Sequence, residues 1–123
     1  MKPIQTSLAP EAIGPYSQAI VAGNLIFCSG QIALTPAGKF LEKTVAEQTK
    51  QVLENLQNVL KAANSDFSKV VKTTIYLKSI EDFAAVNEVY AEFFSEWKPA
   101  RATVEVSNLP KNALVEIEAI AIL

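Results

Sequence analysis

The spacing of apolar residues changes along the chain, and each spacing predicts an element of secondary structure. Apolar runs at Ala19–Val21 and Leu25–Ile32 flank a Gly-Asn turn, which is typical of two strands joined by a tight connection. The alternating, β-branched segment Val70–Leu77 predicts a third strand. Near the end of the chain, alternating segments predict two more strands at Arg101–Val106 and Ala113–Ile122.

A helix is predicted to begin after Thr44. This residue has the side chain of an N-cap, and Glu47, three residues later, completes a capping box. The apolar residues that follow fall on one stripe of a helix, and most of the polar residues between them take the other side. The predicted stripe comprises Val45, Val52, Leu53, Leu56, Val59, Leu60 and Ala63.

A second helix is predicted between the third strand and the fourth. Ser79 and Asp82 open it, and Pro99 stops it because proline disfavours helical backbone in the residue before it. Its predicted apolar stripe comprises Phe83, Val86, Tyr90, Phe93, Phe94 and Trp97.

The resulting order is strand, strand, helix, strand, helix, strand, strand. Each helix needs one face of a sheet to cover its apolar stripe. The crossover through the second helix predicts that part of the sheet is parallel. No helix remains to cover the opposite face, so we expect another copy of the chain to cover it in an oligomer with a sheet-to-sheet interface.

Length and charge narrow the class of protein. The chain has 123 residues, and we expect a single domain over residues 1–123. Its 11 basic and 13 acidic residues give a net charge of −2, which provides no field for nucleic acid or for an anionic membrane. No segment has the apolar length of a signal peptide or a bilayer span. We expect a cytoplasmic protein without a membrane or nucleic-acid partner.

The sequence contains no histidine and a single cysteine, Cys28. These counts exclude a serine or cysteine nucleophile paired with a histidine base, and also zinc sites built from imidazoles or several thiolates. Cys28 lies on an apolar strand, so we interpret it as a buried core thiol. We expect neither a metal nor another cofactor.

Arg101 and Glu116 are the leading candidates for chemistry. Both lie on strands that we expect to be buried, where a charge without a partner is costly. If these strands pair as a hairpin, the two side chains lie near each other. The arginine would then hold a substrate carboxylate through two hydrogen bonds, and the glutamate would move protons or orient water. A structural ion pair is the alternative interpretation.

Three further segments carry polar residues in unusual places. The Gly-Pro pair before Tyr16 predicts a turn that presents this tyrosine at the start of a strand. Ser29 and Gly30 end an otherwise apolar strand, where the glycine marks either the strand end or a close approach of a ligand to the backbone. Asn87 lies among apolar helix residues, and its simplest interpretation is a hydrogen-bonded residue between helix and sheet.

Taken together, these segments resemble the RidA family, also called the YjgF family. The similarity runs in order through nearly the whole chain, and its longest part lies near the C-terminus. The matching segments are residues 13–19 (IGPYSQA), 29–31 (SGQ), 99–110 (PARATVEVSNLP) and 115–119 (VEIEA).

The resemblance implies an α+β, chorismate-mutase-like subunit of the YjgF type. Its expected features are a six-stranded mixed sheet with two helices on one face, and a homotrimer in which three sheets pack as a barrel with clefts between subunits. The implied activity is hydrolytic deamination of reactive 2-imino acids and their enamine tautomers to 2-oxo acids and ammonia. Such imines are released by pyridoxal-phosphate-dependent dehydratases.

The resemblance also assigns roles to residues. Arg101 holds the substrate carboxylate, Glu116 activates water, and Tyr16 is the third catalytic residue. Thr103 occupies a position where many members carry cysteine. Family members with other roles leave alternatives open: a 2-oxo acid sensor, a protein-binding regulator or chaperone, or an endoribonuclease, which the lack of histidine and of a basic track disfavours. The substrate-binding positions that the resemblance implies are Ser29, Gly30, Asn87 and Thr103.

Overall fold

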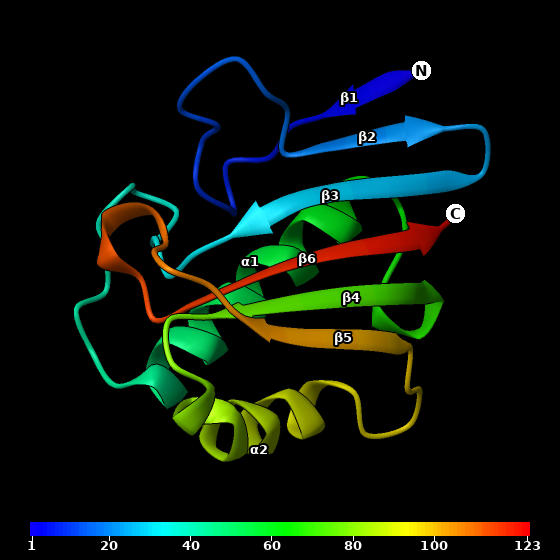
Figure 1. Cartoon of the computed structure of the whole chain (residues 1–123). Coiled ribbons are helices and arrows are strands. Elements are labelled where there is room, and N and C mark those ends of the chain that lie inside the picture. Colours follow the sequence, from blue (N-terminus) through cyan, green and yellow to red (C-terminus); the bar gives the residue numbers. More distant parts are fainter.

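A computed structural model describes all residues of the chain, 1–123. Six strands form one sheet, and two α-helices lie together against one of its faces (Figure 1). Short 3-10 helices precede β4, α2 and β6. The elements are β1 (Lys2–Ile4), β2 (Ala19–Ala22), β3 (Leu25–Gln31), α1 (Val45–Ala62), β4 (Val70–Leu77), α2 (Phe83–Phe93), β5 (Ala100–Glu105) and β6 (Val115–Ile122).

The strand order is β1-β2-β3-β6-β4-β5. Strands β4 and β5 run parallel and the other neighbours are antiparallel, which confirms the prediction of a mixed sheet. The expected hairpin between β5 and β6 is wrong, because β6 lies between β3 and β4 while β5 pairs only with β4 at the edge. The pattern also missed β1, a three-residue edge strand that contains a proline.

Helix α1 begins as predicted. The Thr44 hydroxyl accepts a hydrogen bond from the Glu47 amide at 3.2 Å, and the Glu47 carboxylate accepts one from the Thr44 hydroxyl at 3.1 Å. The apolar stripe is buried from Val52 to Leu60. Asn55 is also fully buried and donates to the carbonyls of Ile32 and Leu34, which fixes the segment after β3 to the helix.

Helix α2 is shorter than predicted. It ends at Phe93 rather than next to Pro99. Val86, Tyr90 and Phe94 are buried, but Trp97 is about half exposed and lies outside the helix, where its indole N–H donates to the Val70 carbonyl at 2.6 Å. This bond ties the connection between α2 and β5 to the start of β4.

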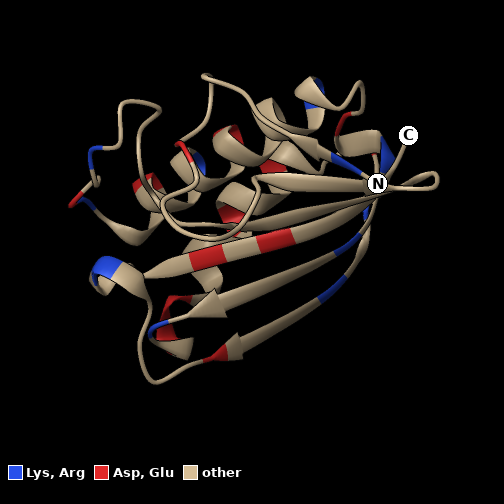
Figure 2. Ribbon diagram, turned by 90° about the horizontal axis from the view of Figure 1, so that it is seen from above, with Lys and Arg blue, Asp and Glu red and all other residues tan.

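The second face of the sheet carries no helix. Apolar side chains on it remain exposed, including Phe27 (44%), Val104 (43%) and Ile122 (37%). β6 adds Glu116 and Glu118 to the same face, and these are the paired red bands on one strand in Figure 2. An uncovered sheet face with apolar residues was expected from the element order.

Candidate active site

Arg101 lies on β5 and faces α2. Its guanidinium donates to the Asn87 side-chain oxygen at 2.7 Å, and lies over the rings of Tyr90 and Phe83, with 4.8 Å and 5.6 Å to the ring centroids. No carboxylate lies within ion-pair distance of it. Because an arginine has five N–H donors and only one is used here, the remaining donors can bind an anion.

The ring of Tyr90 packs against the guanidinium of Arg101. Its hydroxyl shares a 2.7 Å hydrogen bond with Thr73 of β4, and its ring stacks on Phe94 with 4.6 Å between centroids. Burial raises the pKa of Tyr90, so the phenol stays neutral beside the guanidinium. A hollow of about 350 Å³ lies at this position, lined in part by Arg101, Asn87 and Lys98.

Glu116 lies on the other face of the sheet, on β6. A β-bulge in β3 places Ser29 and Gly30 opposite this part of β6, since Cys28 pairs with Ala119 but Gln31 pairs with Ile117. The Glu116 side chain packs directly on Gly30: a methyl group at Gly30 would lie 3.0 Å from the carboxyl carbon. Burial, and secondly the charge of Glu118, raise the pKa of Glu116.

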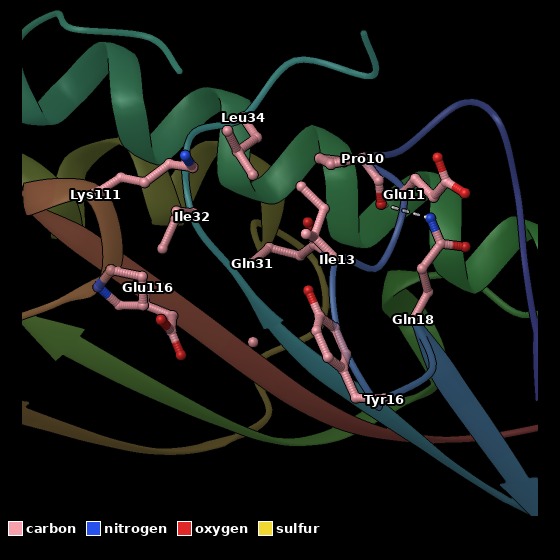
Figure 3. Close-up of a pocket in the computed structure, with 12 residues that line it drawn as sticks. Pro10, Glu11, Ile13, Tyr16, Gln18, Gln31, Ile32, Leu34, Lys111 and Glu116 are labelled. Atoms are coloured by element: carbon pink, nitrogen blue, oxygen red, sulfur yellow. Dashed lines mark hydrogen bonds between the residues drawn. The ribbon is translucent and has the colours of Figure 1, made fainter. Parts of the chain in front are cut away.

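A cleft of about 270 Å³ opens beside Glu116 and Gly30 (Figure 3). Tyr16 stands on one side of the cleft, on the loop that joins β1 and β2, and Lys111 stands on another. The remaining lining residues are Pro10, Glu11, Ile13, Gln18, Gln31, Ile32, Leu34 and Pro110.

The loop that carries Tyr16 is held by several hydrogen bonds. The Tyr16 amide donates to the Gly14 carbonyl at 2.9 Å, in a turn where Gly14 has a φ of +132°. The Ser29 hydroxyl donates to the Ser17 carbonyl at 2.6 Å. Gln18 bonds to the backbone of Thr6 and Pro10. Ser29 thus helps to position Tyr16, and its oxygen can still accept a hydrogen bond.

Arg101 and Glu116 do not meet within one chain. Arg101 pairs with Thr73 and Glu116 pairs with Tyr76 on either side of β4. Side chains three residues apart along a strand point to opposite faces, so the two groups lie on opposite sides of the sheet. The expectation that a hairpin brings them together is therefore wrong, and so is the alternative of an ion pair between them.

The other predicted positions divide between two places: the surroundings of Arg101 on the helix side of the sheet, and the Glu116 cleft on the other side. Asn87 holds Arg101, whereas Gly30 and Tyr16 accompany Glu116. Thr103 lies on β5 two residues from Arg101 on the same face, and its hydroxyl is buried without a hydrogen-bond partner. Such an orphaned hydroxyl is costly unless a ligand or a neighbouring molecule satisfies it.

Lys111 and Gln31 are two of the cleft residues that were not predicted from the sequence. Lys111 lies in the 3-10 helix before β6 and has a φ of +56°, and Asn112 follows with +55°. Two consecutive left-handed residues that are not glycine are strained, and no local pattern announces them. Gln31 is the other one, although the SGQ segment that contains it was noted.

Three further features concern the cysteine thiol, metal binding and membrane crossing. Cys28 is buried as predicted, and burial raises the pKa of its thiol to about 12, so it is unreactive at neutral pH. No cluster of three or more histidine, cysteine, aspartate or glutamate side chains is arranged to hold a metal ion. Neither helix combines the length and apolar character that crossing a membrane requires.

Comparisons with known proteins agree over almost the whole chain. A family model described as Endoribonuclease L-PSP matches residues 6–123. A RutC family protein of Pyrococcus horikoshii is 56% identical over 119 residues, which make up 96% of this chain and 94% of that protein. The human 2-iminobutanoate/2-iminopropanoate deaminase is 50% identical over 120 residues, or 97% of this chain and 88% of that protein.

The fold agrees equally well with a solved structure. The crystal structure of the YjgF gene product from E. coli matches with a TM-score of 0.95 and 45% identity, covering 99% of this chain and 98% of that one. The architecture is therefore the YjgF-type α+β fold that the motifs implied. On its sequence and its fold together, the chain belongs to the RidA (YjgF) family, which the matching model describes as Endoribonuclease L-PSP.

Proposed function

We propose that the protein hydrolyses 2-imino acids and their enamine tautomers to 2-oxo acids and ammonia. The observation that carries this proposal is the half-buried Glu116 carboxylate, with a raised pKa, packed on the Gly30 backbone in an open cleft. A group of this kind can take a proton from water and return it near neutral pH. The name of the human relative supports the same chemistry.

Arg101 is suited to the other end of the substrate. Its free N–H donors would bind the substrate carboxylate through two parallel hydrogen bonds, and Asn87 would hold the guanidinium in place. Thr103, with its unpartnered hydroxyl on the same face, would contact the bound acid. Tyr16 would donate a hydrogen bond from the other side of the cleft.

The reaction needs only water and proton transfer. As the water oxygen forms its bond to the protonated imine carbon, Glu116 accepts the water proton and the C=N π electrons move to nitrogen. Glu116 then returns its proton to the nitrogen of the resulting carbinolamine, and the carbon–nitrogen bond breaks. As the C=O bond forms, the carbinolamine hydroxyl gives its proton to the departing ammonia, which leaves as ammonium. The products are one 2-oxo acid and one ammonium ion for each protonated imine and water consumed.

We propose that these two halves come from different subunits of a homotrimer. Within one chain Arg101 and Glu116 lie on opposite faces of the sheet, so a substrate of a few carbon atoms cannot touch both. The uncovered face with Phe27, Val104 and Ile122 would pack against the sheets of two other copies. The Glu116 cleft of one copy would then lie against the Arg101 side of its neighbour.

A coupled assay tests the activity. An amino-acid oxidase generates the imine in the presence of semicarbazide, and the protein competes with this trap. Wild type should lower semicarbazone formation, whereas Arg101→Ala and Glu116→Gln, each checked for folding, should not. If the folded wild type diverts none of several imines from the trap, hydrolysis is excluded.

A second function is binding of 2-oxo acids without turnover. It is favoured because the groups around Arg101 need no contribution from a second copy of the chain. Its arginine, supporting asparagine and aromatic rings all come from one chain. Under this alternative Arg101→Ala abolishes binding of a 2-oxo acid while Glu116→Gln leaves it intact. RNA cleavage has less support, because the cleft carries one lysine beside two glutamates and gives no basic track for phosphates.

A further inference from the structure

Lys98 is a second cation in the hollow that Arg101 lines. It belongs to the connection between α2 and β5, and together with Arg101 it lines a space of about 350 Å³. None of the other lining residues carries a charge. They are Asn87, Tyr90, Ala91, Phe94 and Pro99. A hollow that gathers two positive charges and no carboxylate is suited to an anionic ligand.

The charge of Lys98 is not neutralised by a partner within the chain. Its ammonium donates to the Ser95 carbonyl at 3.2 Å, which is a neutral acceptor. An ammonium has three N–H donors, so two of them remain for a ligand. Arg101 likewise donates only to the neutral side chain of Asn87. The hollow thus presents two cations with unused donors.

The backbone is held on both sides of Lys98. The indole N–H of Trp97 donates to the Val70 carbonyl at 2.6 Å, which ties the preceding residue to the start of β4. Pro99 follows with a φ fixed by its ring, and β5 begins at Ala100. The ammonium therefore extends from a fixed point of attachment, which reduces the freedom that it loses when a ligand binds.

The charges on the two sides of the sheet differ in sign. The Glu116 cleft carries two carboxylates, Glu11 and Glu116, and one ammonium, Lys111. A second carboxylate on a substrate would be repelled there and attracted by Lys98. A substrate whose 2-carboxylate lies on Arg101 would therefore direct a distal carboxylate to Lys98, and its reacting carbon would stay free to face a glutamate.

We propose that Lys98 is a specificity-determining residue that selects 2-imino acids with a second carboxylate at the end of the side chain, as in the imine of glutamate. This inference rests on the proposed hydrolysis, in which Arg101 binds the 2-carboxylate. Lys98 itself takes no part in proton transfer. Because Lys98 is exposed, its attraction for a carboxylate is worth about fivefold in affinity at low ionic strength and is weakened by salt.

Binding of stable 2-oxo acids tests the inference without turnover. 2-Oxoglutarate carries both carboxylates, and its 5-methyl ester keeps the carbon chain but has a neutral distal end. Titration calorimetry with the intact protein at low salt should show 2-oxoglutarate binding about fivefold more tightly than the ester. Added salt should reduce this difference. Equal affinity for the two acids, or no binding of 2-oxoglutarate, overturns the inference.

Variants of Lys98 show whether this residue is responsible. Lys98→Met removes the charge and should abolish the advantage of 2-oxoglutarate, whereas affinity for the ester should stay that of wild type. Lys98→Arg keeps the charge and should preserve the advantage. The matched control is Lys50→Met on α1, which removes an exposed charge outside the hollow and should also preserve it. An advantage that persists in Lys98→Met contradicts the assignment to Lys98.

Turnover provides a second, separable readout. In the semicarbazide assay, the preference for the glutamate imine over the methionine imine should fall about fivefold in Lys98→Met and stay unchanged in Lys50→Met. Wild type that hydrolyses the methionine imine, with the same preference in Lys98→Met, contradicts the role of Lys98 alone. Wild type that hydrolyses no imine contradicts the proposed function, and the binding experiment still decides on Lys98.

Discussion

The side chain of Glu116 packs directly on the backbone of Gly30, at the β-bulge that interrupts the pairing of β3 with β6. A methyl group at Gly30 would lie 3.0 Å and 3.1 Å from the carboxyl carbon and the Cγ of this glutamate. The glycine therefore sets the position of the carboxylate, although no left-handed backbone requires a glycine there.

Gly30→Ala should accordingly reduce activity more than stability. The added methyl displaces the Glu116 carboxylate, and we expect kcat/KM for imine hydrolysis to fall by about tenfold or more, since small misplacements of a catalytic group are costly. Gly23→Ala is the contrasting variant. No atom lies within 4 Å of the added methyl, but its φ of +63° makes alanine unfavourable. Gly23→Ala should lose about 1–2 kcal/mol of stability and retain kcat/KM. Equal loss of activity in both variants would contradict this contrast.

The pH dependence of hydrolysis should report Glu116. Burial, and secondly the charge of Glu118, raise the pKa of Glu116, so the acid limb of the kcat/KM profile should lie above the ordinary pKa of glutamate. Glu118→Gln removes one cause and should move that limb to lower pH. Glu54→Gln on α1 removes the same charge outside the cleft and should leave the limb in place. An unchanged limb in Glu118→Gln would contradict this assignment.

The same shift has a consequence for stability. A carboxyl group whose pKa is raised in the folded state holds its proton more tightly there than in the unfolded chain. The contribution of Glu116 to the free energy of unfolding therefore decreases as the pH rises from its unfolded pKa through its folded pKa. Glu116→Gln removes this dependence, so denaturant unfolding should show the variant gaining stability relative to wild type across that range.

Asn87 should affect substrate binding through Arg101. Its side-chain oxygen accepts the only hydrogen bond that the guanidinium donates within the chain. Asn87→Ala should raise KM about five- to tenfold and lower kcat less, since the carboxylate is held in both ground state and transition state. Glu88→Ala, at the neighbouring exposed helix position, is the control and should leave KM unchanged. A selective loss of kcat would instead place Asn87 at the reacting carbon.

Thr103 should be dispensable for folding. Its buried hydroxyl has no partner, so Thr103→Val should keep or raise the melting temperature while it lowers kcat/KM a few-fold. Thr73→Val is the opposite case, because the Thr73 hydroxyl bonds to Tyr90 at 2.7 Å. That variant should lose about 1 kcal/mol. A similar loss of stability in Thr103→Val would indicate a structural role for the hydroxyl.

Local patterns predicted the elements well, for identifiable reasons. The start of α1 depends on Thr44 and Glu47, which interact within one turn, and its apolar stripe depends on helix period alone. The parallel pairing of β4 and β5 follows from the crossover through α2. The prediction for the end of α2 was wrong because Trp97 donates to the carbonyl of Val70, a residue 27 positions away. The spacing of apolar residues along a helix cannot indicate a contact between residues so far apart.

The geometry of the site was less predictable. Which strands pair depends on the whole sheet, and the insertion of β6 between β3 and β4 separates Arg101 from Glu116. The motifs nevertheless drew attention to Arg101 and Glu116, because a family resemblance reports positions and not contacts, and the roles of the two residues stay predictions. The contribution of Lys111 depends on a left-handed backbone that a lysine rarely adopts, so only the structure could reveal it.

A mixing experiment tests most directly whether one site is built from two copies of the chain. Arg101→Ala and Glu116→Gln, each inactive alone, are dissociated together in equal amounts and reassembled. If the arginine and the glutamate of a site come from neighbouring subunits of a trimer, random assembly restores both groups in about a quarter of the sites, and activity should recover to that extent. If the mixture stays inactive although light scattering shows mixed trimers, or if wild type is a fully active monomer, the shared site is contradicted.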